Sequence, residues 1–117
     1  MELILWRHAE AEPHAADREG DQLRELTAKG ARHASRMGAW LDRQLPSHCR
    51  ILSSPAARCV QTAQALGRKF TAVEALNTDS TAERILEAAG WPGNRHTVVV
   101  VGHQPLLGKV ASLIFSG

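Results

Sequence analysis

The sequence predicts a three-layer α/β/α fold around a mostly parallel central sheet. Three short apolar runs have the composition of strands, residues 2–6 (ELILW), 49–54 (CRILSS) and 97–103 (TVVVVGH). Their hydrophobicity is continuous rather than alternating, which is typical of strands that helices cover on both faces. Segments with helical periodicity lie between these runs, so strands and helices alternate along the chain, as they do in parallel sheets.

Each helix predicted between the strands has one apolar face. Thr27 can cap a helix in which apolar residues recur at i, i+3, i+4 and i+7 as far as Leu45. Ser54 and Pro55 are the expected N-cap and first-turn residues of the next helix. A short strand near residues 71–76, a helix over 79–89 and a last helix from about Pro105 complete the pattern. Residues 9–25 predict a long loop, a kind of segment that is often functional in a compact domain.

Length, charge and cysteine content restrict the class of protein. A chain of 117 residues with 44% hydrophobic content fits a single domain, residues 1–117. The 14 basic and 12 acidic residues are spread along the chain, so we expect no nucleic-acid binding. Two cysteines do not make a disulfide framework, and we expect them to be reduced. No signal peptide and no run near ~18 apolar residues occurs, so we predict a soluble, cytoplasmic monomer that does not bind membranes.

Residues suited to phosphate chemistry follow each of the three main strands. Arg7 and His8 follow the first, Arg58 lies soon after the second, and His103 ends the third. Ligands of such sheets bind beyond the carboxyl ends of the strands, and a helix N-terminus such as that near Arg58 favours an anion. Arginine forks bind phosphoryl oxygens, and a neutral imidazole can attack phosphorus. The sequence therefore predicts a phosphoryl-transfer site at this edge.

Four motifs then resemble one family. RHAEAE, RELTAKG, SSPAARCVQTA and VVGHQP appear in the order and approximate spacing of the histidine phosphatase (phosphoglycerate mutase-like) superfamily, and are most similar to its SixA-type phosphohistidine phosphatase branch. The resemblance implies that His8 is the transiently phosphorylated nucleophile and that Arg7 and Arg58 bind the phosphoryl oxygens. It also implies that His103 stabilises charge on the transferring group, with the backbone N–H of Gln104 as a further donor. Gln61 and Thr62 also match the family pattern, and we expect them to hold their helix against its neighbours rather than contact substrate.

A carboxylic general acid, which larger members of that superfamily carry, is not identified by any motif here. Glu74 and Glu83 are candidates by spacing, and Glu10 and Asp17 are candidates from the predicted loop. An alkoxide leaving group has a conjugate acid with a pKa near that of water, ~15.7, whereas imidazole titrates near ~6.5. Because protonated phosphohistidine can expel neutral imidazole with little help, a weak or missing acid favours phosphohistidine over a phosphate ester as substrate.

The resemblance thus implies a phosphatase that needs no metal or other cofactor. Its substrate would be phosphohistidine on a protein, such as a histidine phosphotransfer domain, and small phosphate esters are the alternative. Two other classes remain open. One is a metal site formed by His8, Glu10, Glu12 and His14 at i, i+2 spacing, and the other is a non-catalytic module that binds a phosphorylated partner. Family members continue with further strand after the GHxP helix, so residues 1–117 are compatible with a C-terminally truncated domain.

Overall fold

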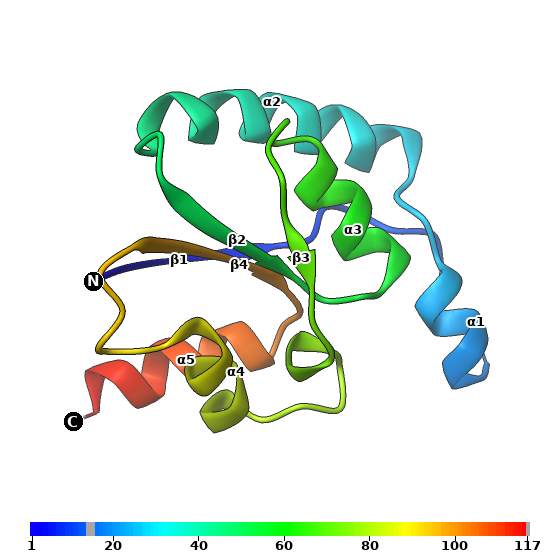
Figure 1. Cartoon of the computed structure of the whole chain (residues 1–117). Coiled ribbons are helices and arrows are strands. Elements are labelled where there is room, and N and C mark those ends of the chain that lie inside the picture. The colour runs from blue at the N-terminus through cyan, green and yellow to red at the C-terminus, as the bar shows by residue number, and fades with distance from the viewer. Residues whose placement is uncertain (14–15, 117) are drawn as a thin grey trace.

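A four-stranded parallel sheet forms the centre of the molecule (Figure 1). The structure is a computed structural model and describes residues 1–13 and 16–116. The strands are β1 (Glu2–Arg7), β2 (Cys49–Ser53), β3 (Thr71–Ala72) and β4 (Thr97–Gly102). Their spatial order is β1-β4-β2-β3, so β4 lies between β1 and β2. The predicted parallel sheet is therefore confirmed.

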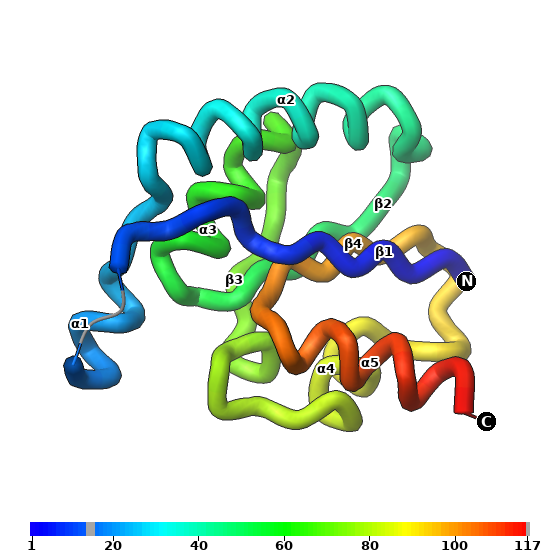
Figure 2. Tube along the Cα trace, turned by 180° about the vertical axis from the view of Figure 1, so that it is seen from behind, coloured from blue at the N-terminus to red at the C-terminus, as the bar shows by residue number. Residues whose placement is uncertain are grey.

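Helices cover both faces of this sheet, as Figures 1 and 2 show from opposite sides. Two pack on one face, α2 (Ala28–Gln44) and α3 (Ala57–Gln64), and two on the other, α4 (Ala82–Ala89) and α5 (Leu106–Phe115). A short helix, α1 (Arg18–Leu23), lies beyond one end of the sheet, and a 3-10 turn spans Glu74–Leu76. The three-layer α/β/α prediction is confirmed. None of the helices in the described ranges is long and apolar enough to cross a membrane.

The valine run of β4 joins the two apolar cores. Val98 and Val100 pack in the core under α4 and α5, whereas Val99 and Val101 pack in the core under α2 and α3. All four side chains are fully buried. Successive side chains of a strand point to opposite faces, so a continuous apolar run is what a central strand between two helical layers requires.

Several predicted helix ends are confirmed. The Thr27 side chain accepts a hydrogen bond from the Gly30 N–H and caps α2. Gly90 ends α4 with a left-handed φ of 75°, a conformation that glycine adopts without steric cost. The start of α4 was expected near residue 79, but the helix begins at Ala82, after a capping bond from the Arg84 N–H to Thr81. Cys49 and Cys59 are both free thiols.

The predicted capping role of Ser54 and Pro55 is wrong. Helix α3 begins at Ala57, and its N-cap residue, Ala56, offers no side-chain bond. The chain turns late because the Ser54 N–H still bonds to the Val101 carbonyl of β4, at 3.0 Å. The prediction of a loop over residues 9–25 is also wrong in part, because α1 lies within it with Asp17 as its N-cap.

Candidate active site

The carboxyl ends of β1, β2 and β4 bring the predicted residues together. Arg7 pairs with Gly102 across the sheet, so the residues that follow, His8 and His103, are neighbours. The His8 N–H bonds to the Gly102 carbonyl at 3.1 Å, and the two imidazole rings meet edge to face with centroids 5.4 Å apart. Arg7, His8, Arg58 and His103 all line one open cavity of about 1450 Å³. The predicted convergence of these four side chains is thus present in the structure.

The imidazole of His8 is held as a neutral ring in one tautomer. Its Nδ1 atom lies 2.7 Å from the Ala9 carbonyl oxygen. A carbonyl oxygen can only accept, so Nδ1 carries the proton and Nε2 has the free lone pair. Burial lowers the pKa of His8 below 6.5, and the positive charges of Arg58 and Arg7 lower it further, although the bond to Ala9 opposes this shift. The ring is therefore suited to act as a nucleophile through Nε2.

A hydrogen bond joins Ala9 to helix α3. The Ala9 N–H donates to Thr62 Oγ1 at 3.1 Å, and the Thr62 hydroxyl donates to the Arg58 carbonyl at 2.8 Å. Gln61 on the same helix accepts from the Leu26 N–H at 2.8 Å. As expected from the sequence, Gln61 and Thr62 join α3 to its neighbours, and neither lines the cavity.

Arg58 is buried in the first turn of α3, with 2% of its surface exposed. Its Nη1 donates to the Asp21 carbonyl at 2.7 Å, and its Nη2 donates to the Asp21 carboxylate at 3.2 Å. The Nε–H of Arg58 is buried and has no hydrogen-bond partner among the described residues. A buried donor without a partner costs about 1–3 kcal/mol, so this guanidinium keeps one donor that none of the described residues uses.

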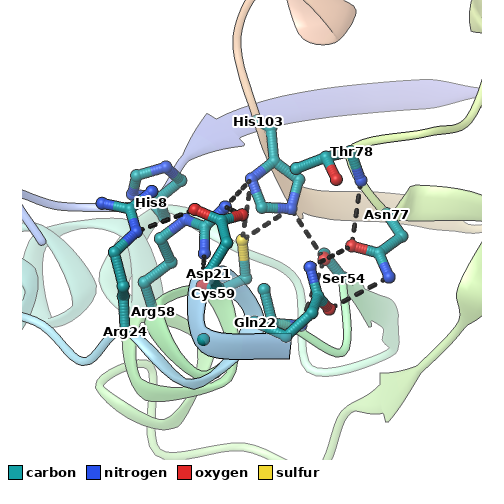
Figure 3. Close-up of polar contacts among 12 residues, drawn as sticks. His8, Asp21, Gln22, Arg24, Ser54, Arg58, Cys59, Asn77, Thr78 and His103 are labelled. Atoms are coloured by element: carbon teal, nitrogen blue, oxygen red, sulfur yellow. Dashed lines mark hydrogen bonds and ion pairs between the residues drawn. The ribbon is translucent and has the colours of Figure 1, made fainter. Parts of the chain in front are cut away.

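His103 is buried between Arg58 and Ser54 (Figure 3). Its Nδ1 lies 3.5 Å from Arg58 Nη2, and its Nε2 lies 2.8 Å from Ser54 Oγ. Burial, followed by the charges of Arg58 and His8, lowers the pKa of His103 to about 4. In the ligand-free protein the ring is therefore neutral at pH 7.

Asp21 and Arg24 belong to the site but were not predicted from the sequence. The Asp21 carboxylate accepts from Arg24 Nε at 2.9 Å as well as from Arg58 (Figure 3). Burial raises the pKa of Asp21, but bonds and charges from Arg24 and Arg58 outweigh it and hold the pKa below 3.8. Arg24 stands inside the RELTAKG motif, and an acid three residues before an arginine is the one pattern that marks the pair.

The other predicted residues are placed as follows. Gln104 lines the cavity, and its side chain accepts from the Gly108 N–H, so the role of its backbone N–H stays a prediction. Glu10 and Asp17 also line the cavity, where Glu10 accepts from the Thr27 hydroxyl and Asp17 caps α1. Glu74 and Glu83 lie elsewhere: Glu74 in the 3-10 turn and Glu83 in the first turn of α4 do not line this cavity.

The alternative metal site finds no support in the described part of the chain. No group of three or more His, Cys, Asp or Glu side chains that could hold a metal ion occurs among those residues. One of the four proposed ligands, His14, lies outside the described residues, so the complete set is not tested.

Comparisons with known proteins find similar chains that are named as phosphohistidine phosphatases. The chain is 29% identical to the phosphohistidine phosphatase SixA of Escherichia coli (strain K12), over all of this chain and 76% of that protein. A proposed phosphohistidine phosphatase SixA from Nakamurella multipartitia is 37% identical, with a TM-score of 0.74 over 90% of this chain. This chain spans 60% of that one. A proposed SixA from Agrobacterium tumefaciens is 28% identical, with a TM-score of 0.80 over 97% of this chain and 75% of that one.

A family model identifies the wider group. The model of the histidine phosphatase superfamily (branch 1) matches residues 3–89. The match includes His8 and Arg58, and His103 lies beyond its end, directly after β4, the strand that pairs with β1. Since the match covers more than half of the sequence, the chain belongs to the histidine phosphatase superfamily.

Proposed function

We propose that this protein is a phosphatase that removes the phosphoryl group from phosphohistidine on a protein, through a covalent phosphohistidine at His8. The observation that carries the proposal is the bond from His8 Nδ1 to the Ala9 carbonyl, at 2.7 Å. It leaves Nε2 of a neutral ring with its lone pair in a cavity that Arg7 and Arg58 also line. A nucleophile beside two arginines is the arrangement that phosphoryl transfer requires.

The reaction has two displacements. In the first, His8 Nε2 forms a bond to phosphorus while the P–N bond to the substrate imidazole breaks. The leaving imidazole departs neutral because protonated phosphohistidine already carries the proton it needs. In the second, water attacks the phosphorus of phospho-His8, releasing inorganic phosphate and returning His8 to its free form. Both steps transfer a phosphoryl group without a change of oxidation state.

Stabilisation of the transferring group falls to the charged and polar neighbours of His8. Negative charge spreads over three phosphoryl oxygens in the transition state. Arg7 and Arg58 would bind these oxygens, and the buried Nε–H of Arg58, which has no partner among the described residues, gives one more donor. Fixed donors of this kind need no reorganisation during the reaction, so positioning and electrostatics supply most of the catalysis.

The carboxylates at the cavity support phosphohistidine rather than an ester. The pKa of Asp21, held by two arginines, lies below 3.8, so this group is ionised at neutral pH and cannot protonate a leaving alkoxide. Glu10 and Asp17 are engaged with Thr27 and with the α1 N-terminus. A P–N bond needs no acid of this kind. The similarity to SixA phosphohistidine phosphatases agrees with this choice of substrate.

Turnover of three substrates tests the proposal. Phosphohistidine protein should be hydrolysed faster than a phosphoserine peptide or a sugar phosphate, and EDTA should not change the rate. His8→Ala should abolish turnover and the acid-labile phosphoryl label, whereas His96→Ala, at an exposed site outside the cavity, should preserve both. Equal or faster turnover of the esters would refute the substrate assignment. Activity that survives His8→Ala would refute the mechanism, and loss with EDTA that metal restores would favour the metal-site alternative.

A further inference from the structure

Ser54 makes a direct contact with His103 that its position in the sequence does not reveal. The residue follows β2 and is fully buried. Its N–H bonds to the Val101 carbonyl, which fixes the Ser54 backbone to the central strand. Its Oγ lies 2.8 Å from His103 Nε2 and 3.3 Å from the Ala56 N–H. The hydroxyl is therefore held in place by the sheet and by the turn before α3.

The partners of the two ring nitrogens identify the tautomer of His103. Arg58 Nη2, which can only donate, faces Nδ1 at 3.5 Å, so Nδ1 has the lone pair in the neutral ring. Nε2 therefore carries the hydrogen and donates it to Ser54 Oγ. Cys59 Sγ lies 3.5 Å from the same nitrogen, but sulfur is the weaker acceptor. The short bond to Ser54 is thus the main contact of Nε2–H.

The hydroxyl of Ser54 cannot act on a substrate directly. Ser54 has no exposed surface and does not line the cavity that His8 and Arg58 share. It also does not cap α3, whose N-cap residue is Ala56. The Ser54 hydroxyl can therefore act only through the His103 ring, because a hydrogen bond to one imidazole nitrogen decides which nitrogen stays free for chemistry.

We propose that Ser54 is a positioning residue for His103, an inference that rests on the proposed phosphatase function. Its hydroxyl holds the Nε2–H tautomer and keeps Nδ1 turned toward Arg58 and the His8 side of the cavity. A phosphoryl group bound beside the Arg58 guanidinium brings negative charge that favours the protonated ring, and Nδ1–H then donates to one of the phosphoryl oxygens. Without Ser54 the ring can rotate or change tautomer, and the donor no longer faces the transferring group.

The experiment compares two neighbouring serines. Ser54→Ala removes the contact, and Ser53→Ala is the matched control: Ser53 is equally buried, but its Oγ donates to the Ser54 carbonyl and not to His103. Nitrogen-15 NMR of the His103 ring should show Nε2 protonated in the native protein and in Ser53→Ala. Ser54→Ala should change the His103 nitrogen shifts and give a mixture of tautomers.

Kinetics on phosphohistidine protein complete the test. Ser54→Ala should lower kcat about tenfold or more with KM within about twofold, since misplacing a catalytic group slows the chemical step rather than binding. Ser54→Thr, which restores a hydroxyl, should recover most of kcat and the native His103 shifts. His103 shifts unchanged in Ser54→Ala, or an equal kcat loss in Ser53→Ala, would overturn the proposal. If the native protein hydrolyses no phosphohistidine, the proposed function fails, while the NMR comparison still decides whether Ser54 sets the tautomer.

Discussion

The Arg58 guanidinium donates to both the backbone and the side chain of Asp21, with bonds of 2.7 Å to the carbonyl and 3.2 Å to the carboxylate. The predicted phosphate-binding arginine is thus also the residue that attaches α1 to the site. No residue of helix α1 is fully buried. Among the described residues, α1 also makes reciprocal amide bonds between Gln22 and Asn77, 3.0 Å each, and an exposed ion pair of Arg18 with Asp79.

We therefore expect the stability of α1 to depend on pH through Asp21. The folded pKa of Asp21 lies below 3.8, so its ionised form stabilises the folded state above that pH, and this contribution is lost as pH falls through the folded pKa. Amide hydrogen exchange over Arg18–Leu23 should accelerate, beyond its intrinsic pH dependence, as pH drops below 3.8. Asp21→Asn should remove this dependence, whereas Asp79→Asn, at an exposed pair worth about 0–1 kcal/mol, should keep it. The same pH dependence in Asp21→Asn would contradict the assignment.

Replacing Arg58 by lysine should show whether activity requires the planar guanidinium group or only its positive charge. Lysine keeps the positive charge but cannot bind Asp21 and a phosphoryl group at once through a planar fork. We expect Arg58→Lys to lower kcat/KM for phosphohistidine protein by about 100-fold, and to weaken inhibition by inorganic phosphate. Arg50→Lys, at an exposed position on β2, is the control and should act like the native protein. Near-native kcat/KM in Arg58→Lys would show that the planar guanidinium of Arg58 is not required.

His8 and His103 of the candidate site should both titrate below the usual range of imidazole. Burial is the largest cause of both shifts, and it lowers the pKa of His103 to about 4 and the pKa of His8 below 6.5. Because attack requires neutral His8, kcat/KM should fall only as pH drops below 6.5, once ionisation of the substrate is taken into account. NMR titration should give a midpoint near 4 for the His103 ring, identified by its absence in His103→Gln. A midpoint at or above 6.5 for either ring would contradict the statement that burial lowers its pKa.

Gly30 allows α2 to approach the chain that follows His8. A Cβ at this position would collide with the Glu10 carbonyl, the group that accepts the Thr27 N–H at 3.0 Å. Gly30→Ala should therefore displace the backbone near Glu10, cost about 1–3 kcal/mol of folding free energy and reduce activity. Gly93→Ala, where a Cβ meets nothing within 4 Å, is the control for both measurements. Thermal unfolding and turnover that match those of Gly93→Ala would show that this close contact is not required.

The sheet could be predicted from the sequence because local composition determines it. A run of valines is suited to a buried central strand. Residues that follow neighbouring parallel strands lie at the same edge of the sheet, which is why the proximity of His8 and His103 could be predicted. Helix α1 could not be found in the same way, because it has no fully buried residue and its sequence shows no apolar periodicity. Ser54 was misassigned because serine before proline is also a capping pattern, and its partner His103 lies 49 residues away in sequence.

The pairing of β4 with both its neighbours has a practical consequence for protein engineering. His8 and Ser54 each donate a backbone N–H to adjacent carbonyls of β4, those of Gly102 and Val101, and His103 follows β4 directly. The backbone separation of these residues is thus set by the repeat distance between strands, roughly 4.8 Å. A library designed to change which phosphorylated molecule is accepted should diversify α1 and the outer wall of the cavity, and leave the three strand ends untouched.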